Sequence, residues 1–372
     1  MKALLNDWFS FLRGYYKNEY PDYILNKKIS DEIPTFIYHH VEHDDFKSCL
    51  EHLKKNGYRT LCADECETRL SDGLRDKEVV ITFDDGLSDV YDIAYPLLKE
   101  YGFKAVVFII PHWIGKQGMI TWDQVIEMHD SGVIDFQSHS LTHKAIFVSD
   151  QIIDFYGPHL KDRKPWNIPV LSNGYCNSGD NTELYGMPIY EFASRFSDHV
   201  AYIPDEDINQ SCINYVANNS GDNFFNRKTW KQDLMAEMER LSGDPDAIQS
   251  DSQQSRAVFE EEDIQLDQIK TELEKSKAII EQKLKDKRVS HFAFPWNEVG
   301  MKTLDLLPRL GYRTVYAGMK RINIPEQYKE NLLIIRRVTG DFIKCLPGSG
   351  RTSFWRVLVF KMFRRFFRGV MY

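Results

Sequence analysis

The chain lacks the cysteine patterns of zinc ribbons and redox pairs. Its six cysteines are scattered along 372 residues, and no two of them are separated by only two residues, which excludes both classes of site. Long apolar runs are also missing. The longest run of note, residues 105–110, is far shorter than the roughly 20 residues of a membrane-spanning helix. No membrane span is therefore predicted.

An export signal is also missing from the sequence. The first residues, 1–8, contain no continuous apolar stretch of the kind that a secretory signal needs. We therefore expect a cytoplasmic protein whose cysteines are reduced thiols. The composition, 42% hydrophobic and 27% charged, is typical of a globular rather than a disordered chain. The length suffices for one large domain or two.

Negative charge is absent from residues 351–372, between Arg351 and Tyr372. This segment carries +6, which leaves −14 for the rest of a chain whose net charge is −8. An acidic body argues against nucleic-acid binding. The same segment contains seven aromatic residues, and a basic helix with a bulky apolar face suits an anionic membrane surface, where each Lys or Arg contributes about 1 kcal/mol. We favour that interpretation; the alternative is a helix packed on the body of the protein.

Apolar segments alternate with amphipathic ones in the first half of the chain. The alternation predicts a parallel α/β sheet or barrel. Its expected strands are residues 34–38, 79–83, 105–110 and 134–137, and its expected helices are 45–56, 88–101 and 121–130. Thr121 and Gln124 have the spacing of a capping box at the start of the third helix.

The alternation stops near residue 144 and resumes near residue 262. The intervening residues are rich in Asn, Asp, Ser, Gly and Tyr and are too many for a simple loop, so we expect an insertion with order of its own. A helix at 262–286 and strands at 289–294, 312–317 and 332–338 are expected to follow, with a further helix at 302–310. The predicted domains are an amphipathic segment (1–30), an α/β domain (31–345, with the insertion at about 144–262) and the basic aromatic tail (346–372).

Carboxylates and imidazoles stand where two of the expected strands end. Asp84 and Asp85 follow residues 79–83, and His139 and His143 follow residues 134–137. The carboxyl ends of parallel strands meet at one edge of a sheet, and histidines four residues apart suit two ligands of one metal. Asp85 and the two histidines therefore predict a metal site, with Asp84 left free as a base for metal-assisted hydrolysis. The alternative for the Asp-Asp-Gly sequence is a helix cap.

These segments resemble the motifs of a known family. TFDDG at 82–86 and HSLTH at 139–143 are similar to the first two motifs of the polysaccharide deacetylases, the NodB homology domain of carbohydrate esterase family 4. FAFPW at 292–296 is similar to the third motif, and IYHHV at 37–41 and Trp122 also match. The resemblance spans about residues 33–145 and 262–340. It implies a distorted (β/α) barrel that removes N-acetyl groups from amino sugars.

The resemblance also implies roles for individual residues. Asp85, His139 and His143 would bind Zn²⁺, with Co²⁺, Ni²⁺ or Mn²⁺ as alternatives. Asp84 would be the general base that acts on the metal-activated water.

The end of the third motif is expected to contact the substrate. Pro295 and Trp296 would line the sugar site, with Trp296 stacked on a sugar ring; the alternative for Trp296 is a place in the core. An oxyanion would be held by a backbone N–H near this motif or near the Asp-Asp-Gly turn.

The sequence departs from the family pattern at two expected catalytic positions. The arginine that usually stands two residues before the proline of the third motif, where it orients the base, is replaced by Ala293. The late Leu-x-His motif, which supplies a general acid, is also missing, because no histidine follows His291 and residues 335–338 occupy its place. The acid is therefore open: another group, water or His291. His39 and His40 are expected near the same edge, one of them buried without a catalytic role.

The sequence as a whole predicts a metal-dependent enzyme that removes an N-acetyl group from an amino sugar. The expected substrate is a lipid-linked or surface-polysaccharide intermediate at the inner face of the cytoplasmic membrane. Two alternatives remain open. One is a deformylase or O-acetyl esterase on the same scaffold, and the other is a catalytically inactive carbohydrate-binding domain.

Overall fold

The computed structural model describes residues 20–25, 32–160, 169, 182–243, 258–318 and 332–368, without the side chains of 242–243 and 362–368. The predicted amphipathic segment at 1–30 falls almost wholly outside these residues and stays a prediction. The chain divides into two compact units. The first comprises Met1–Leu141, Glu272–Val299 and Leu304–Tyr372, and the second comprises Thr142–Thr271 and Gly300–Thr303.

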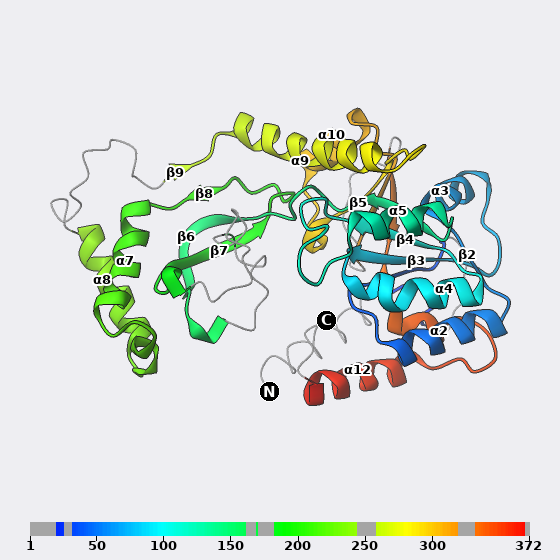
Figure 1. Cartoon of the computed structure of the whole chain (residues 1–372), viewed down its shortest axis with the longest axis horizontal. Coiled ribbons are helices and arrows are strands. Elements are labelled where there is room, and N and C mark those ends of the chain that lie inside the picture. Colours follow the sequence, from blue (N-terminus) through cyan, green and yellow to red (C-terminus); the bar gives the residue numbers. More distant parts are fainter. Residues whose placement is uncertain are drawn as a thin grey trace. The chain divides into compact units, whose positions relative to one another are not determined.

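The first unit is built on a nine-stranded parallel sheet (Figure 1). The strand order is β12-β11-β10-β5-β4-β3-β1-β13, and β2 pairs with β3. The strands are β1 (Thr35–Tyr38), β2 (Arg59–Thr60), β3 (Glu78–Asp85), β4 (Ala105–Ile109), β5 (Ile134–Ser138), β10 (His291–Ala293), β11 (Thr314–Ala317), β12 (Leu333–Arg336) and β13 (Val338–Thr339).

The sheet closes on itself through one residue. Strands β12 and β13 lie at opposite ends of the strand order, yet only Arg337 separates them in the chain. Because β12 pairs with β11 and β13 pairs with β1, the chain from β12 to β13 joins the two edges of the sheet. We call this junction the seam. The result is a nearly closed (β/α) barrel, which confirms the predicted fold class.

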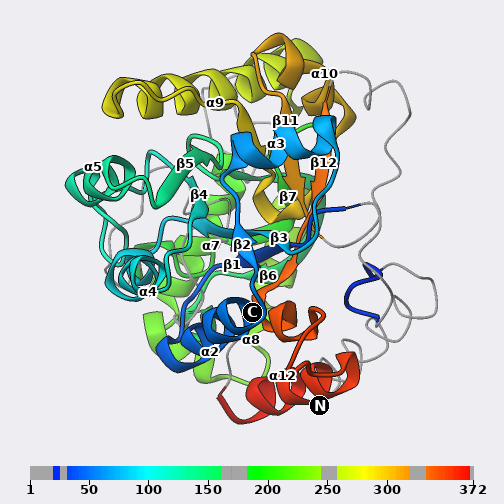
Figure 2. The ribbon, with the colours of Figure 1, turned by 90° about the vertical axis from the view of Figure 1, so that its right-hand side faces the viewer.

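Helices surround the strands of this barrel, as α2, α4 and α5 do in Figure 2. The helical segments of the barrel and its C-terminal extension are α2 (His43–Lys55), α3 (Ala63–Asp72), the π-helical turn η1 (Val90–Ala94), α4 (Tyr95–Tyr101), α5 (Trp122–Asp130), α9 (Glu262–Lys283), the 3₁₀ turn η6 (Pro295–Asn297), α10 (Met301–Arg309), the 3₁₀ turn η7 (Gly340–Cys345) and α12 (Phe354–Arg368). Helix α5 begins with the capping box expected from the sequence. The backbone N–H of Thr121 donates to Gln124 Oε1 (2.8 Å), and the N–H of Gln124 donates to Thr121 Oγ1 (3.3 Å).

An apolar cluster fills the space between the strands and α3. Strand β3 is buried along most of its length, which explains its continuous apolar sequence, since strands of parallel sheets are covered on both faces. The cluster consists of Ile33, Leu61, Ala63, Cys66, Val80, Val106, Phe108, Ala293, Tyr316 and Ile335.

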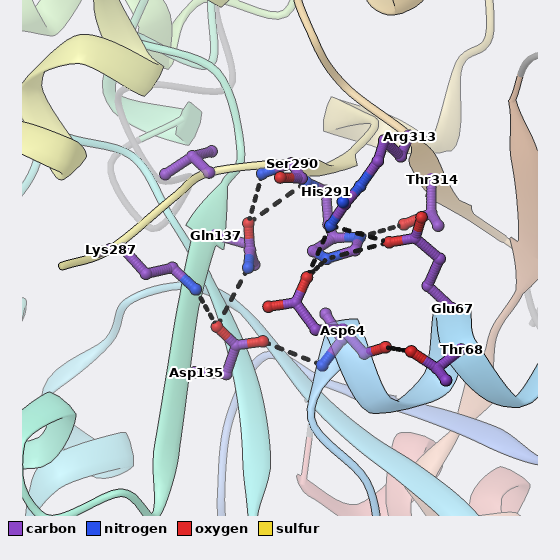
Figure 3. A network of polar contacts seen from close by, with 12 residues as sticks. Asp64, Glu67, Thr68, Asp135, Gln137, Lys287, Ser290, His291, Arg313 and Thr314 are labelled. Atoms are coloured by element: carbon purple, nitrogen blue, oxygen red, sulfur yellow. Dashed lines mark hydrogen bonds and ion pairs between the residues drawn. The ribbon is translucent and has the colours of Figure 1, made fainter.

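A polar network lies at the amino-terminal ends of β10 and β11 (Figure 3). His291 is fully buried there, with Nε2 3.0 Å from Asp64 Oδ1 and Nδ1 2.5 Å from Thr314 Oγ1. Arg313 Nη2 lies 2.8 Å from Asp64 Oδ1 and 3.0 Å from Glu67 Oε2. Both ring nitrogens of His291 are thus engaged, at the strand ends opposite those that carry the motif residues. This placement removes His291 from the candidate proton donors.

The second unit contains an antiparallel pair of strands with its own core. Its elements are β6 (Ala145–Phe155), η2 (Pro158–Leu160), η4 (Thr182–Leu184), β7 (Pro188–Ser194), β8 (Tyr202–Ile203), α7 (Glu206–Asn218), η5 (Gly221–Asn226), α8 (Trp230–Gly243) and β9 (Val258–Phe259). Strand β6 pairs with β7, and β8 pairs with β9. Buried side chains from β6, β7, α7 and α8 form one apolar cluster, among them Phe155, Tyr190, Cys212 and Leu234.

Helix α12 packs one face on the barrel and exposes another. Phe354 and Leu358 are buried, and the Phe354 ring stacks on Phe342 of η7 with centroids 5.7 Å apart. On the opposite face, Trp355 and Phe360 are 40% and 54% exposed. The first turns of the tail therefore form the packed amphipathic helix that was the alternative expectation. Within the described residues, no helix has the length and apolar character required to cross a membrane.

Candidate active site

The register of the parallel strands brings the motif residues to one edge of the barrel. Asp85 of β3 pairs with Ile109 of β4, and Ile109 pairs with Ser138 of β5. His139 follows Ser138 directly, so it emerges at the same level as Asp85. The convergence that the sequence predicted for these two residues is therefore a consequence of strand pairing.

Asp85, His139 and His143 form the cluster expected from the sequence. One ligand atom from each residue lies within 4.8 Å of those of the other two. His139 Nε2 is 3.6 Å from Asp85 Oδ1. Two atoms bound to one tetrahedral zinc at about 2.0–2.2 Å lie about 3.3–3.6 Å apart, so this pair needs little movement to share an ion. A carboxylate with two imidazoles is a common ligand set of catalytic zinc.

The hydrogen bonding of His139 also fits a metal ligand. Its Nδ1 lies 2.9 Å from the carbonyl oxygen of Ala293. Since a carbonyl can only accept, Nδ1 carries the proton, and the lone pair of Nε2 faces Asp85. A metal-ligating histidine is held in the same way by a carbonyl behind it. The residues present therefore fit a divalent ion.

Backbone strain is concentrated at this edge. Asp85 (φ 71°), Ser140 (φ 69°), His143 (φ 57°) and Trp296 (φ 61°) all adopt positive φ. Each non-glycine residue in this region costs of order 1–3 kcal/mol, and such residues cluster at functional sites. Two of the proposed ligands, Asp85 and His143, have this strained conformation. The strain is consistent with a site selected for function rather than for stability.

Asp84 is bound by an arginine that the sequence analysis did not identify. Arg337 Nη1 donates to Asp84 Oδ1 at 2.6 Å, and Nη2 donates to Oδ2 at 2.7 Å. The two side chains are 0% and 2% exposed. Burial raises the pKa of Asp84, but the positive charge of Arg337 outweighs burial, and the net effect lowers the pKa to about 2. Asp84 is therefore a carboxylate at neutral pH.

Arg337 stands at the seam and makes the contact with Asp84 that the resemblance would assign to an arginine of the third motif. Its backbone N–H donates to the Ala317 carbonyl at 2.8 Å, which holds it at the end of β12. The neighbouring Arg336 points elsewhere and contacts Glu32 at 3.0 Å. The adjacent residues Arg336 and Arg337 at the end of an apolar segment could have indicated this contact from the sequence. Side chains alternate between the two faces of a strand, so one of the two must point into the barrel.

Helix α9 supports the loop that carries the histidines. Glu272 Oε2 accepts a hydrogen bond from the backbone N–H of Leu141 at 3.0 Å, and Ser276 Oγ lies 2.8 Å from Ser138 Oγ. All four groups are buried. Glu272 could not be recognised from the sequence, because nothing in the charged pattern of α9 distinguishes it from the exposed acids around it.

The adjacent histidines of the first strand have different surroundings. His39 follows Tyr38, which pairs with Phe83 of β3, so it emerges beside Asp84. Burial lowers the pKa of His39, while the negative charges of Asp85 and Asp84 act in the opposite direction. His40 is half-exposed and lies 3.1 Å from Asp89 Oδ2. His39 therefore belongs to the site, whereas His40 stands outside it.

The residues expected to contact substrate follow β10. The carbonyl of Ala293 contacts His139, and Pro295 and Trp296 come two and three residues later, in η6. Pro295 is buried and Trp296 is partly exposed. Their strand thus ends beside the metal-ligand cluster, as the third motif requires, and the contact with a sugar stays a prediction.

Comparisons with known proteins point to the same family as the motifs. Residues 71–161 match the model of the polysaccharide deacetylase family. YxkH of Bacillus subtilis, grouped by name with the polysaccharide deacetylases, is 37% identical over 122 residues, which cover 30% of this chain and 43% of that protein. A poly-β-1,6-N-acetyl-D-glucosamine N-deacetylase of Staphylococcus epidermidis is 30% identical over 145 residues, 37% of this chain and 44% of that protein.

A solved de-N-acetylase from Aggregatibacter actinomycetemcomitans is also similar, with 15% identity, a TM-score of 0.49 and coverage of 83% of this chain and 94% of that one. The chain spans less than half the length of the two curated relatives. The family match over residues 71–161 confirms the resemblance seen in the motifs.

Proposed function

We propose that this chain is a metal-dependent hydrolase that removes the N-acetyl group from an amino sugar. The observation that carries the proposal is the triad of Asp85, His139 and His143 beside the buried pair of Asp84 and Arg337. A buried ion pair contributes little net stability, because desolvation offsets the attraction. A catalytically inactive sugar-binding domain has no use for such a pair next to three ligands, whereas a hydrolase needs an ionised base there.

The proposed roles of the site residues are based on their geometry. A divalent ion held by Asp85, His139 and His143 would lower the pKa of a water molecule and polarise the amide carbonyl. Asp84 would orient the attacking water and take its proton, because its Oδ2 lies 3.7 Å from His139 Nε2, at the edge of the ligand cluster. Arg337 would keep Asp84 ionised and fix the plane of its carboxylate.

A second group has to deliver a proton to the leaving amine. We assign this role to His39, which is not a member of the triad. Strand pairing places it beside Asp84, and the negative charges of Asp85 and Asp84 both act on its pKa. It would accept the proton from Asp84 and pass it to the nitrogen as the C–N bond breaks. The balance is one water consumed, with acetate and a free amine released.

The proposed substrate class is supported by a relative and by the third motif. The Staphylococcus relative is named for poly-β-1,6-N-acetyl-D-glucosamine, and Trp296, which is partly exposed after β10, would stack on a sugar ring. We therefore propose an N-acetylhexosamine residue within a surface polysaccharide or a lipid-linked intermediate.

The test combines metal content with acetate release from β-1,6-linked N-acetylglucosamine oligomers. With zinc supplied, Asp84→Asn should retain the metal and lose at least about 100-fold in rate, as expected for a general base, whereas Asp85→Asn should lose the metal. Release of formate or of O-linked acetate, but not of N-linked acetate, would favour the deformylase or esterase alternative. Failure of the wild type to bind any divalent ion would favour the binding-domain alternative.

We also propose a cytoplasmic location in which α12 contacts an anionic membrane surface. Trp355, Val359 and Phe360 are 40–54% exposed, and Arg356 lies among them on the helix. The test is co-sedimentation with phosphatidylglycerol vesicles, with phosphatidylcholine vesicles as the comparison. Binding should fall in a Trp355→Ser, Phe360→Ser double variant but not in Leu74→Ser, an exposed site elsewhere on the barrel. Equal binding of both variants would overturn the proposal.

A further inference from the structure

The outer surface of the barrel carries a cleft between α4 and α5, which are neighbouring helices in Figure 2. Its volume is about 490 Å³, and it is an open surface depression rather than an enclosed cavity. None of its residues belongs to the candidate active site. The lining residues are Tyr91, Asp92, Tyr95, Pro96, Lys99 and Glu127.

Two tyrosine rings form one wall of the cleft. The rings of Tyr91 and Tyr95 are stacked, with centroids 5.9 Å apart and an interplanar angle of 24°. The hydroxyl of Tyr91 donates a hydrogen bond to Glu127 Oε2 at 2.7 Å, which ties the ring to α5. The wall is therefore positioned by a contact between two helices and does not depend on one flexible side chain.

The backbone beneath this wall is unusual. Tyr91 and Asp92 lie in η1, where the N–H of Tyr95 bonds to the carbonyl of Val90, five residues back. Such π-helical turns are rare, and they occur frequently at functional sites because the wider turn displaces side chains from the regular helical positions. The π-helical turn is therefore a second indication, independent of the cleft volume, that Tyr91 and Asp92 have a functional role.

The charges of the cleft favour a cation. Asp92 and Glu127 are both exposed and bring two negative charges to the cleft. The ammonium of Lys99 brings one positive charge, so the lining has a net negative charge. That ammonium lies 5.0 Å from the centroid of the Tyr95 ring, so the aromatic wall already accepts an ammonium group by cation–π attraction. A phosphate or another anion would meet two carboxylates, whereas a ligand amine would meet carboxylates and ring faces.

We infer that this cleft binds a hexosamine residue with a free amine, as part of the same glycan chain that the active site processes. The inference rests on the proposed function, whose product is such an amine. The ligand ammonium would pair with Asp92 and Glu127, and the apolar face of the sugar ring would lie on Tyr91. Because η1 begins five residues after Asp85, the Tyr91 end of the cleft is the end nearer to the triad in the chain, and Lys99 lies about two helical turns further along. Deacetylated residues bound there would keep the polymer on the enzyme between reactions.

The test is calorimetric titration of the full chain with a β-1,6-linked glucosamine tetramer, which is not a substrate. Tyr91→Ala and the double variant Asp92→Asn, Glu127→Gln should each weaken binding about tenfold or more, the loss expected for removal of an anchoring group. Tyr101→Ala is the matched control, a partly exposed tyrosine at the end of α4. Asp130→Asn is the matched control for charge on α5. Both should leave the affinity unchanged.

The same variants separate this inference from the proposed function. Tyr91→Ala should raise KM for a long N-acetylated polymer and leave acetate release from the N-acetylglucosamine dimer unchanged. If Tyr91→Ala and Tyr101→Ala bind the tetramer with equal affinity, the cleft is not the binding site for the tetramer, whatever the catalytic activity of the variants. If no variant or wild-type sample releases acetate but Tyr91→Ala still loses the tetramer, the cleft stands and the proposed hydrolysis fails.

Discussion

Arg337 holds Asp84 through two parallel hydrogen bonds of 2.6 and 2.7 Å. The two residues are separated by more than 250 positions in the sequence and are both buried. A bidentate guanidinium fixes the orientation of a carboxylate as well as its charge. The direction in which Asp84 presents its oxygen atoms is therefore set by a residue of the seam, and this relationship can be tested directly.

We expect Arg337→Gln to impair the enzyme and the fold together. Removing the guanidinium leaves a buried carboxylate without its cation, which costs about 3–5 kcal/mol of unfolding free energy. The pKa of Asp84 should rise, since burial is then opposed by less positive charge. The acid limb of the profile of kcat/KM against pH should therefore move to higher pH. Arg337→Lys should retain more stability than Arg337→Gln but still lose rate, because an ammonium cannot bind both oxygens.

The control for this change is Arg336→Gln. Arg336 is the adjacent residue, and its side chain, 26% exposed, contacts Glu32, so its loss should cost no more than about 1 kcal/mol. Its pH profile should match that of the wild type. Equal shifts of the acid limb in both variants would contradict the role given to Arg337.

Acid should remove the stability that Asp84 contributes. Its pKa in the folded state is lowered from 3.8 to about 2, so the unfolded chain takes up the proton first as pH falls. The contribution is fully present above about pH 4 and is lost between about pH 4 and pH 2. Urea unfolding of metal-free protein at pH 5, 4 and 3 should give a smaller decline for Asp84→Asn than for wild type. Parallel declines would contradict the assignment.

Metal removal should lower the melting temperature. A ligand that binds only the native state stabilises it by mass action, so a chelator should reduce Tm of the wild type and zinc should restore it. Asp85→Asn and His143→Gln should abolish the response, whereas Asp84→Asn should keep it. A zinc response that survives in His143→Gln would place the metal elsewhere.

The adjacent histidines His39 and His40 should differ in their effect on catalysis. His39→Gln should lower kcat by about 100-fold or more, the usual contribution of general acid catalysis, while the response of Tm to zinc remains. His40→Gln is the matched control and should be close to wild type, because His40 contacts Asp89 at a half-exposed position. Similar rates for the two variants would exclude His39 as the proton donor.

His291 should matter for stability and not for chemistry. It is fully buried and bonded to Asp64 and Thr314, so His291→Ala should cost about 2–4 kcal/mol through unsatisfied polar groups and a cavity. His129→Ala is the control, since its ring is near the surface and its loss should change stability by less than about 1 kcal/mol. The folded His291→Ala protein should keep the wild-type kcat; a loss of kcat there would return His291 to the candidate donors.

The barrel and its metal-ligand cluster could be predicted because both depend on local sequence. Buried parallel strands leave uninterrupted apolar runs, such as residues 79–83, and motif residues directly after such runs must meet at the carboxyl edge. The capping box of α5 was visible for the same reason, since Thr121 and Gln124 are three residues apart. These features require no knowledge of distant contacts.

The partner of Asp84 could not be predicted, because it is decided by pairing between distant strands. Arg337 faces the interior only because β12 pairs with β11 and β13 pairs with β1. The two-residue strand β2 and the π-helical turn η1 were missed for a related reason. Neither has a periodic pattern of its own, and each depends on its neighbours, as Thr60 of β2 does on its pairing with Val79.

The seam also has a consequence for biogenesis. Residues 84–143 leave the ribosome long before residue 337, so a partly made chain already holds the three proposed ligands while its base lacks a partner. Docking of the last strands then performs two tasks at once, since it closes the barrel and delivers the guanidinium to Asp84. An immature or locally opened barrel would therefore leave the Asp84 carboxylate without the guanidinium that fixes its orientation.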